Sequence, residues 1–416
     1  MKITIIIFTL LFSVNSIAQK SYAKQILDSL CGQQYSGRGY VNNGVNLAAN
    51  FLVNELKKIG VKNYPNQNFR QYYKFNVNTF PNNISVKFNN NLLKIGKDYI
   101  LNSNSGSANG TYNVIELNST NFLNTDSQPK NGKTVVVYNF TNLKNRDSIR
   151  YVYHMAMQTS KVAPVIWIQK SKLMYSVGRS EINNPMIVVI DSIYKKPTTI
   201  TLNIKNKFIS NFSNQNIIGY IPSSKKCKLK KEKLIVLTAH YDHLGKMGQA
   251  MFPGANDNAS GVAMLLSLAK KYIKTKNKYG LVFCFFSGEE AGLEGSKYFV
   301  SHPYFKLKQV KFVLNIDIMG GASKGITVVN GTKHKKEFSQ LTKINLANKY
   351  LNEVKKRGPT ANSDHYYFSE NNVPAFFIYS GGKVKNYHDI FDTAENTPLN
   401  KFTEVENLLF SFINYF

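Results

Sequence analysis

The chain has 416 residues, with 43% hydrophobic and 19% charged residues, which is the balance of an ordinary globular protein. This composition excludes wholesale disorder, and the length suits two or three compact units of roughly 100–200 residues each. The formal net charge is +29, from 53 Lys and Arg against 24 Asp and Glu. Such a charge first suggests nucleic acid or an anionic membrane as a partner. Because the lysines are spread along the whole chain, we favour a solvated basic surface and predict no nucleic-acid partner.

The first residues have the pattern of a secretory signal peptide. A basic start precedes an apolar run over residues 3–14, and small residues at Ser16 and Ala18 follow. The run is shorter than the roughly 20 residues of a membrane span, and no later run is long and uncharged enough for one. We therefore predict an exported protein, periplasmic or extracellular, with signal peptide 1–18 and no transmembrane segment. A loose association with an anionic envelope surface stays open.

The three cysteines allow at most one internal disulfide. Cys284 lies inside an apolar run, which predicts a thiol buried in the core. Whether Cys31 and Cys227 pair is left open by the sequence.

The first two parts of the mature chain differ in pattern. Residues 19–80 are predicted to form the N-terminal helical part of the catalytic domain, because apolar residues recur at helical spacing at 23–30 and 45–59. From 81 to 207 Asn and Ser become more frequent. Short strands are predicted there at 84–88, 134–138, 163–168, 186–190 and 199–204, with one helix at 148–161. We predict that 81–207 is a mostly-β inserted domain.

In residues 208–416 apolar strands alternate with amphipathic helices. The predicted strands are 216–221, 234–239, 280–286, 311–316, 326–329 and 375–379, and the predicted helices are 259–274, 293–301, 335–350, 364–370 and 400–415. Alternation of this kind predicts an α/β fold with a mostly parallel central sheet that is flanked by helices. This part is the predicted catalytic domain.

Imidazole and carboxylate side chains follow the predicted central strands. In open α/β sheets functional groups gather where the strands end, so we expect these side chains to lie together. They are His240 and Asp242 after the strand 234–239, Asp257 before the next helix, Glu289 and Glu290 after 280–286, Asp317 after 311–316, and His388 beyond 375–379.

Two histidines and three carboxylates in this set suit a pair of zinc ions. One histidine and two carboxylates would bind each ion, and Asp257 would be shared between them. A shared carboxylate would hold the ions about 3.5–4 Å apart, as in two-metal hydrolases. Three carboxylates this close would repel each other without cations between them, so the pattern predicts that metal is required.

Two further acidic residues have predicted supporting roles. Glu289 is adjacent to Glu290, so their side chains point in different directions, and Glu289 can take a proton from a water between the metals. Asp242 lies two residues from His240, and its carboxylate could accept the second imidazole N–H and orient the ring.

These residues resemble those of the M28 family of zinc-dependent exopeptidases. The matching blocks are Thr238-Ala-His-Tyr-Asp-His243, Gly254-Ala-Asn-Asp-Asn-Ala-Ser-Gly261, Phe286-Ser-Gly-Glu-Glu-Ala-Gly-Leu-Glu-Gly-Ser296, Asn315-Ile-Asp317, Ser363-Asp-His365 and Tyr387-His-Asp389. Gly37-Arg-Gly39 looks like the family's N-terminal lead-in, and the insert resembles, in strand pattern and position, a protease-associated domain.

The resemblance implies a role for each matching residue. His240, Asp257 and Asp317 would bind one zinc ion, and Asp257, Glu290 and His388 the other. Glu289 would be the general base and Asp242 would support His240. A cis peptide bond would follow Asp257. The last block is looser than is usual in the family, so His365 competes with His388 as the final ligand.

The resemblance implies a metallopeptidase that acts on peptide substrates. The favoured hypothesis is an exported di-zinc aminopeptidase, in which a metal-bound hydroxide generated with Glu289 attacks the scissile carbonyl. One alternative is a glutaminyl cyclase-like, single-zinc acyltransferase. The two-metal residue set disfavours it, as does the position of the only tryptophan, Trp167, in the insert. A non-catalytic, peptidase-like binding protein is the other alternative. Side-chain specificity, amino- against carboxypeptidase preference, the role of the insert and the oligomeric state stay open.

Overall fold

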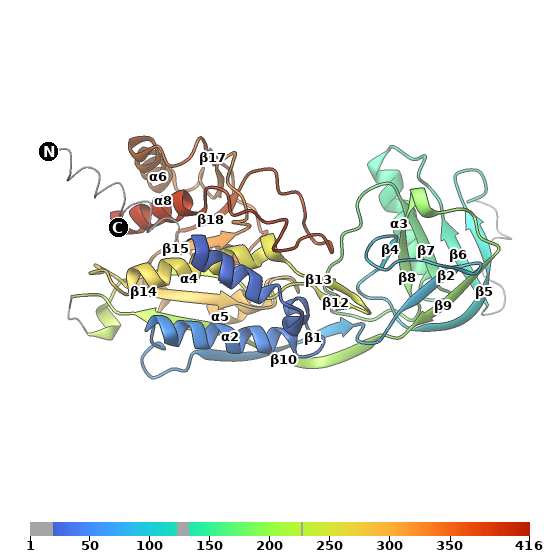
Figure 1. The fold of residues 1–416 in the computed structure, drawn as a ribbon, viewed down its shortest axis with the longest axis horizontal. Coiled ribbons are helices and arrows are strands. Elements are labelled where there is room, and N and C mark those ends of the chain that lie inside the picture. The colour runs from blue at the N-terminus through green and yellow to red at the C-terminus, as the bar shows by residue number, and fades with distance from the viewer. Residues whose placement is uncertain (1–19, 123–132, 226–227) are drawn as a thin grey trace.

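The computed structural model describes residues 20–122, 133–225 and 228–416 (Figure 1). The predicted signal peptide 1–18 and Cys227 lie outside these ranges. In the described part of the chain two eight-stranded sheets occupy opposite halves of the molecule, which confirms an α/β part, the predicted catalytic half, joined to a second, mostly-β part. None of the helices within these ranges is both long and apolar enough to cross a bilayer.

The N-terminal helices pack on the catalytic sheet. Residues 20–30 are helical, and the short turn η1 (Gln33–Arg38) leads to α2 (Gly44–Ile59). Helix α2 ends because Gly60 takes a left-handed conformation at φ 93°, which glycine adopts without a steric penalty, and donates its N–H to the Leu56 carbonyl. The buried face of α2 joins the largest apolar cluster of the molecule.

The catalytic sheet is mixed, with parallel strands at its centre. Its strand order is β1-β10-β14-β11-β15-β18-β16-β17. β14, β11, β15 and β18 are mutually parallel, whereas the contacts of β14 with β10 and of β18 with β16 are antiparallel. Every residue of β11 and β14 is buried, because helices cover both faces of the sheet. The strands are β1 (Arg70–Thr79), β10 (Lys207–Ile221), β11 (Leu234–His240), β14 (Gly280–Phe286), β15 (Val310–Asp317), β16 (Ile326–Val329), β17 (Val354–Lys356) and β18 (Ala375–Ser380).

Helices pack on both faces of this sheet. On one face α4 and α8 contribute Leu265 and Leu409 to the largest apolar cluster, and on the other α5 and α7 contribute Phe299 and Phe368 to a separate cluster. This layering confirms the predicted arrangement of strands and flanking helices. The helices are α4 (Ser260–Tyr272), α5 (Glu294–Ser301), α6 (Lys335–Asn348), α7 (His365–Glu370) and α8 (Phe402–Tyr415), with short turns η4 (Leu229–Lys231) and η6 (Leu307–Gln309).

Strand β1 corrects the expectation of a purely helical N-terminal part. Its buried residues Tyr73, Phe75 and Val77 alternate with exposed ones, which is the period of a half-buried strand. β1 pairs antiparallel with β10, from Arg70 opposite Ile217 to Thr79 opposite Lys207. The two strands form the ribbon that leads from the catalytic half into the insert and back (Figure 1).

The insert has its own sheet and core. The strands of this sheet are β2 (Ser85–Phe88), β3 (Asn91–Leu92), β4 (Tyr99–Leu101), β5 (Ala108–Leu117), β6 (Thr134–Tyr138), β7 (Val165–Gln169), β8 (Met186–Ile190) and β9 (Thr199–Ile204), in the order β3-β2-β9-β5-β6-β7-β8-β4. Helix α3 (Arg146–Thr159) begins where the Asn145 side chain accepts two backbone N–H groups, and η3 (Asp191–Ile193) follows β8. Hairpin β12 (Gly245–Met247) and β13 (Ala250–Phe252) of the catalytic half packs Met247 and Phe252 into the core of the insert.

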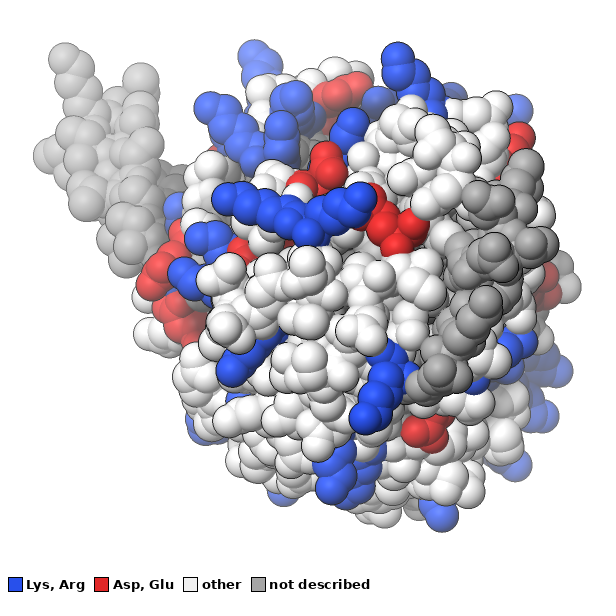
Figure 2. Space-filling model, turned by 90° about the vertical axis from the view of Figure 1, so that its right-hand side faces the viewer, with Lys and Arg blue, Asp and Glu red and all other residues white. Residues whose placement is uncertain are grey.

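The basic residues are dispersed over the face at the insert end of the molecule. Figure 2 shows the insert end of the molecule, where Lys and Arg side chains stand apart among wide uncharged areas, with acidic side chains between some of them. The described residues on this face form no continuous basic band. This distribution fits a solvated basic surface.

Candidate metal centre

The predicted ligands converge at one edge of the catalytic sheet. His240 is the last residue of β11 and Asp317 is the last residue of β15, and the two strands are parallel neighbours. Glu289 and Glu290 follow β14, which pairs with β11 on its other side so that Phe286 lies opposite His240. The parallel strands therefore bring these side chains to the same edge.

Asp257 lies between two histidines. It comes from the irregular turn Ala255–Ala259 that precedes α4. Its Oδ1 is 3.2 Å from His240 Nε2, and its Oδ2 is 3.1 Å from His388 Nε2. Asp317 Oδ2 is 3.4 Å from His240 Nε2, and Glu290 Oε2 is 3.1 Å from His388 Nε2. Each imidazole thus faces one oxygen of Asp257 and one further carboxylate.

These spacings fit the ligands of a tetrahedral zinc ion. Two ligand atoms that each lie 2.0–2.1 Å from such an ion are about 3.3–3.4 Å apart. His240 Nε2 and Asp317 Oδ1 are buried and form no hydrogen bond within the described ranges, so both are available as metal ligands. Buried polar atoms of this kind are costly unless a partner satisfies them. The donor set therefore fits two metal ions that share Asp257.

Glu289 lies beside the same centre. A carboxylate oxygen of Glu289 lies within 4.8 Å of ligand atoms of His240 and Asp317. Ligand atoms of His240, Asp257 and Glu290 also lie within 4.8 Å of one another. The direct contacts of the two imidazoles pair each ion with one histidine, because each imidazole Nε2 can bind only one ion. Glu289 is then a neighbour of the centre on its His240 side.

In the protein without metal, the imidazoles of His388 and His240 and the carboxyl of Glu289 hold protons more tightly than usual. Burial lowers the pKa of His388, but Glu290 and Asp257 outweigh it and raise the pKa to about 11. Burial also lowers the pKa of His240, but Asp317 and Glu289 outweigh burial and raise this pKa well above the usual value. Burial raises the pKa of the Glu289 carboxyl well above its ordinary range. Metal ions can replace the protons held here.

The structure changes the expected contact of Asp242. His240 Nδ1 is 3.2 Å from the backbone carbonyl of Asp242 and 3.8 Å from the carboxylate, so the carbonyl is the acceptor within hydrogen-bond reach. The carboxylate instead accepts the hydroxyl of Tyr40 at 2.9 Å and the backbone N–H of Glu289 at 3.3 Å. Asp242 thereby joins the strand end of His240 to the loop that carries Glu289.

His388, and not its competitor His365, faces the cluster. His365 is buried on α7, stacks on Phe377 with ring centroids 5.3 Å apart, and has its pKa lowered to about 4 by burial. His243 contributes from the other side: its Nδ1 lies 2.7 Å from Glu290 Oε1, opposite the oxygen that faces His388. His243 therefore holds the Glu290 carboxylate in place.

Arg38 supports the site in a way that the sequence did not indicate. Its side chain is completely buried and donates to four backbone carbonyls, those of Tyr241 at 2.8 Å, Leu30 at 3.1 Å, Pro253 at 2.6 Å and Gly254 at 2.7 Å. It ties the end of β11 to the segment that leads to Asp257. Its place between two glycines in Gly37-Arg-Gly39 was the only available signal.

Asp392 orients the turn of the shared aspartate. Its two carboxylate oxygens accept the backbone N–H groups of Asn256 at 2.8 Å and Asp257 at 3.0 Å. The peptide bond between Asp257 and Asn258 is cis, as the resemblance predicted.

The Cys284 thiol lies in the apolar core, as the sequence predicted.

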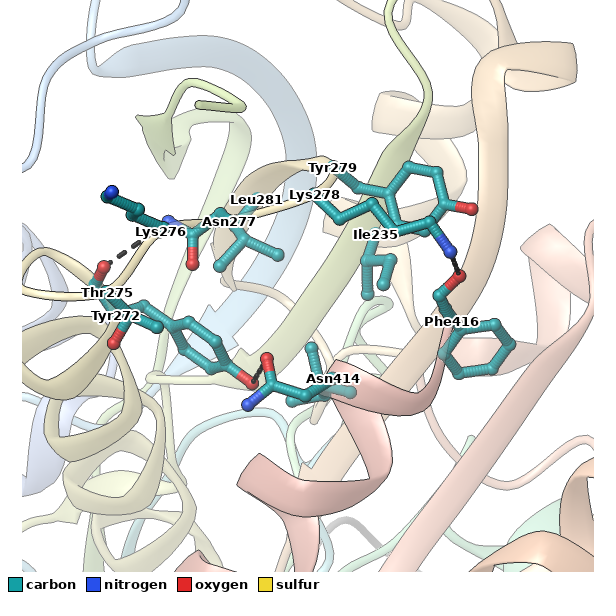
Figure 3. A pocket seen from close by; sticks show the side chains of 11 residues that line it. Ile235, Tyr272, Thr275, Lys276, Asn277, Lys278, Tyr279, Leu281, Asn414 and Phe416 are labelled. Atoms are coloured by element: carbon teal, nitrogen blue, oxygen red, sulfur yellow. Dashed lines mark hydrogen bonds between the residues drawn. The ribbon is translucent and has the colours of Figure 1, made fainter. Parts of the chain in front are cut away.

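A separate cavity lies at the other end of the sheet. It has a volume of about 200 Å³, and its lining includes Ile235 and Leu281 near the beginnings of β11 and β14 (Figure 3). Ile235 precedes His240 by five residues of β11, and a strand rises roughly 3.3 Å per residue, so this wall of the cavity is about 17 Å from His240. Its lining contains Lys276 and Lys278 but no carboxylate or histidine side chain. The cavity is therefore unrelated to the candidate metal centre.

Residues 216–413 match the model of peptidase family M28. This part of the chain belongs to that family. It contains the whole cluster from His240 to His388, so the family match and the geometry concern the same residues.

Two relatives agree with this assignment. The chain is 35% identical over 118 residues to "Aminopeptidase YwaD" of Bacillus subtilis, an alignment that covers 28% of this chain and 24% of that protein. It is 29% identical to a "Probable leucine aminopeptidase" of Arthroderma otae, over 41% of this chain and 48% of that one. The chain thus spans half or less of the length of these two relatives.

Two solved structures share the fold over nearly their full length. A zinc aminopeptidase from Bacillus subtilis matches 94% of this chain and 93% of its own with a TM-score of 0.69 at 17% identity. An aminopeptidase from an Aneurinibacillus strain matches 95% and 94% with a TM-score of 0.63 at 20% identity. Both alignments extend over the insert as well as the M28 part, so this chain shares the fold of both parts with them.

Proposed function

We propose that this chain is an exported di-zinc aminopeptidase that hydrolyses N-terminal peptide bonds. The observation that carries the proposal is the position of Asp257, with one oxygen facing His240 and the other facing His388, and a further carboxylate beside each imidazole. The names of the similar proteins support the choice of an aminopeptidase among peptidases.

The residues have distinct tasks in this proposal. His240 and Asp317 would hold one zinc ion, His388 and Glu290 the other, and Asp257 both. Bound zinc polarises a carbonyl group and makes water more acidic. We assign to Glu289 the removal of a proton from the attacking water and its return to the leaving amine. Burial raises the pKa of this carboxyl above its ordinary range, which favours its holding the proton between the two transfers and supports the assignment.

Substitution of the base tests the mechanism. Glu289→Gln should keep the zinc content of the wild type while kcat falls by about 10²–10⁴, the usual contribution of a general acid and base. Glu353→Gln, which changes an exposed carboxylate, serves as the control. Metal analysis should give two zinc ions per chain. Near-normal turnover of Glu289→Gln would overturn the role of the base.

A substrate panel tests the reaction class. Aminoacyl chromogenic substrates should be cleaved, and N-acetylated versions should not be, because an aminopeptidase requires a free amino terminus. Cyclisation of N-terminal glutaminyl peptides, together with a single tightly bound zinc ion, would favour the glutaminyl cyclase alternative.

Export is proposed from the sequence of residues 1–18 alone. Fractionation of the native host should find the chain outside the cytoplasm, and N-terminal sequencing should find a start near Gln19. An uncleaved chain in the cytoplasm would contradict the proposal.

A further inference from the structure

The insert contacts the loop of His388 at three consecutive residues. The backbone N–H of Tyr175 donates to the carbonyl of His388 at 3.0 Å. Lys172 Nζ forms an ion pair with Asp389 and also donates to the Lys385 carbonyl at 3.2 Å. Ile390 packs against the core of the insert.

The Lys172 ion pair is asymmetric in burial. The side chain of Asp389 is 4% exposed, whereas that of Lys172 is 41% exposed. A buried carboxylate is costly unless a positive charge or hydrogen bonds compensate it. The other carboxylate oxygen of Asp389 accepts the backbone N–H of Phe391 at 2.8 Å. Lys172 is therefore the countercharge that allows Asp389 to stay in its buried position next to His388.

The backbone of His388 needs external support. Its φ is 54°, in the left-handed region that few residues other than glycine adopt. Such a conformation persists where surrounding contacts hold it, and the hydrogen bond from Tyr175 is one of these contacts. The side chain that this backbone presents lies 3.1 Å from both Asp257 and Glu290.

The segment that makes these contacts is itself fixed at its far end. Residues 172–179 follow β7, and we call them the brace segment. Arg179 forms an ion pair at 2.6 Å with Glu294, the first residue of α5, just beyond the loop of Glu289 and Glu290. The carbonyl of Gly178 accepts the backbone N–H of Asn78 at 2.8 Å. The brace segment therefore spans from the loop of His388 to the start of α5.

We propose that the insert positions the metal centre, with Lys172 and Tyr175 as positioning residues that set the place of His388 through its own loop. This inference rests on the proposed zinc function. It gives the insert a task within the site: the ligand from the C-terminal part of the chain is held by residues that precede the first ligand by about 70 positions in the sequence.

The test measures zinc retention in the full-length mature chain. Lys172→Met should release one of its two zinc ions to a chromogenic chelator about 10- to 100-fold faster than the wild type, which is the usual effect of losing a group that orients a ligand. Lys172→Arg keeps the charge and should restore slow release. Lys170→Met, an exposed lysine beside the brace segment, should behave as the wild type.

A double variant separates positioning from a general loss of stability. Asp389→Asn should release zinc as fast as Lys172→Met, and the combined variant no faster than either, because both changes remove the same ion pair. Additive effects, or release from Lys172→Met at the wild-type rate, would overturn the inference. A wild-type chain that binds fewer than two zinc ions would instead refute the proposed function.

Discussion

Asp392 accepts the backbone N–H of Asp257 at 3.0 Å, so a residue near the C-terminus fixes the turn that presents the shared carboxylate. Its second oxygen holds Asn256 in the same way. The geometry of the proposed zinc pair depends on this contact, although Asp392 faces neither histidine.

We expect Asp392→Asn to weaken zinc binding about 10- to 100-fold. The side-chain amide nitrogen of asparagine is a donor, so it cannot accept one of the two backbone N–H groups that Asp392 now accepts. The free energy of unfolding should fall by about 1–3 kcal/mol for the same reason. Zinc titration with a competing chelator measures the first effect and urea unfolding the second. Glu395→Gln is the matched control, since it changes a nearby exposed carboxylate. Equal zinc affinity in Asp392→Asn and the wild type would exclude the positioning role.

Arg38→Lys should destabilise the fold by about 3 kcal/mol or more, because a lysine cannot reach all four carbonyls and leaves buried acceptors unpaired. The measurement is urea unfolding with a chelator present, so that zinc does not mask the difference. Arg146→Lys, at an exposed position on α3, should leave the unfolding curve unchanged. If both variants unfold alike, Arg38 is not the tie between β11 and the turn of Asp257.

Zinc binding should release protons. The pKa of His388 is raised to about 11, so at pH 7 its imidazole is protonated in the chain without metal, and zinc requires the neutral form. The apparent zinc affinity should therefore rise with pH between about 6 and 9. Calorimetry in buffers of different ionisation enthalpy counts the released protons. An affinity and an enthalpy that depend on neither pH nor buffer would contradict this expectation.

Glu406 predicts a pH dependence of stability away from the site. Its carboxylate is buried on α8 without a hydrogen bond in the described part of the chain, and burial raises its pKa to about 7 despite Lys271 nearby. The folded chain then binds this proton more tightly than the unfolded chain. Stability from this group is therefore present below about pH 4.5 and is lost as the pH rises to about 7.

Glu406→Gln should thus stabilise the protein at pH 8 by up to about 3 kcal/mol, the equivalent of the pKa shift, and have no effect near pH 4. Urea unfolding at the two pH values measures this difference. Glu404→Gln, on the exposed side of the same helix in an ion pair with Lys401, should change stability by less than about 1 kcal/mol at either pH. A destabilised Glu406→Gln at pH 8 would show that the charged form is satisfied in the fold.

The sequence by itself determined the catalytic α/β layout and the candidate ligands. β11 and β14 are continuous apolar runs because both of their faces are buried, and polar residues directly after such runs mark the edge of the sheet. β5 was not predicted, because most of its residues are exposed or half-buried and show no regular alternation. β1 was not predicted either, although its buried and exposed residues alternate over residues 71–77.

Only the tertiary structure decided which residues hold the ligands in place. Arg38 reaches carbonyls up to 216 positions away, and Asp392 reaches a backbone N–H 135 positions away. Side-chain contacts with distant backbone groups leave no periodic trace in a sequence, because any residue can offer a carbonyl or an N–H. The same holds for the ion pair between Lys172 and Asp389, which exists because β1 and β10 carry the insert to the edge where the metal centre lies.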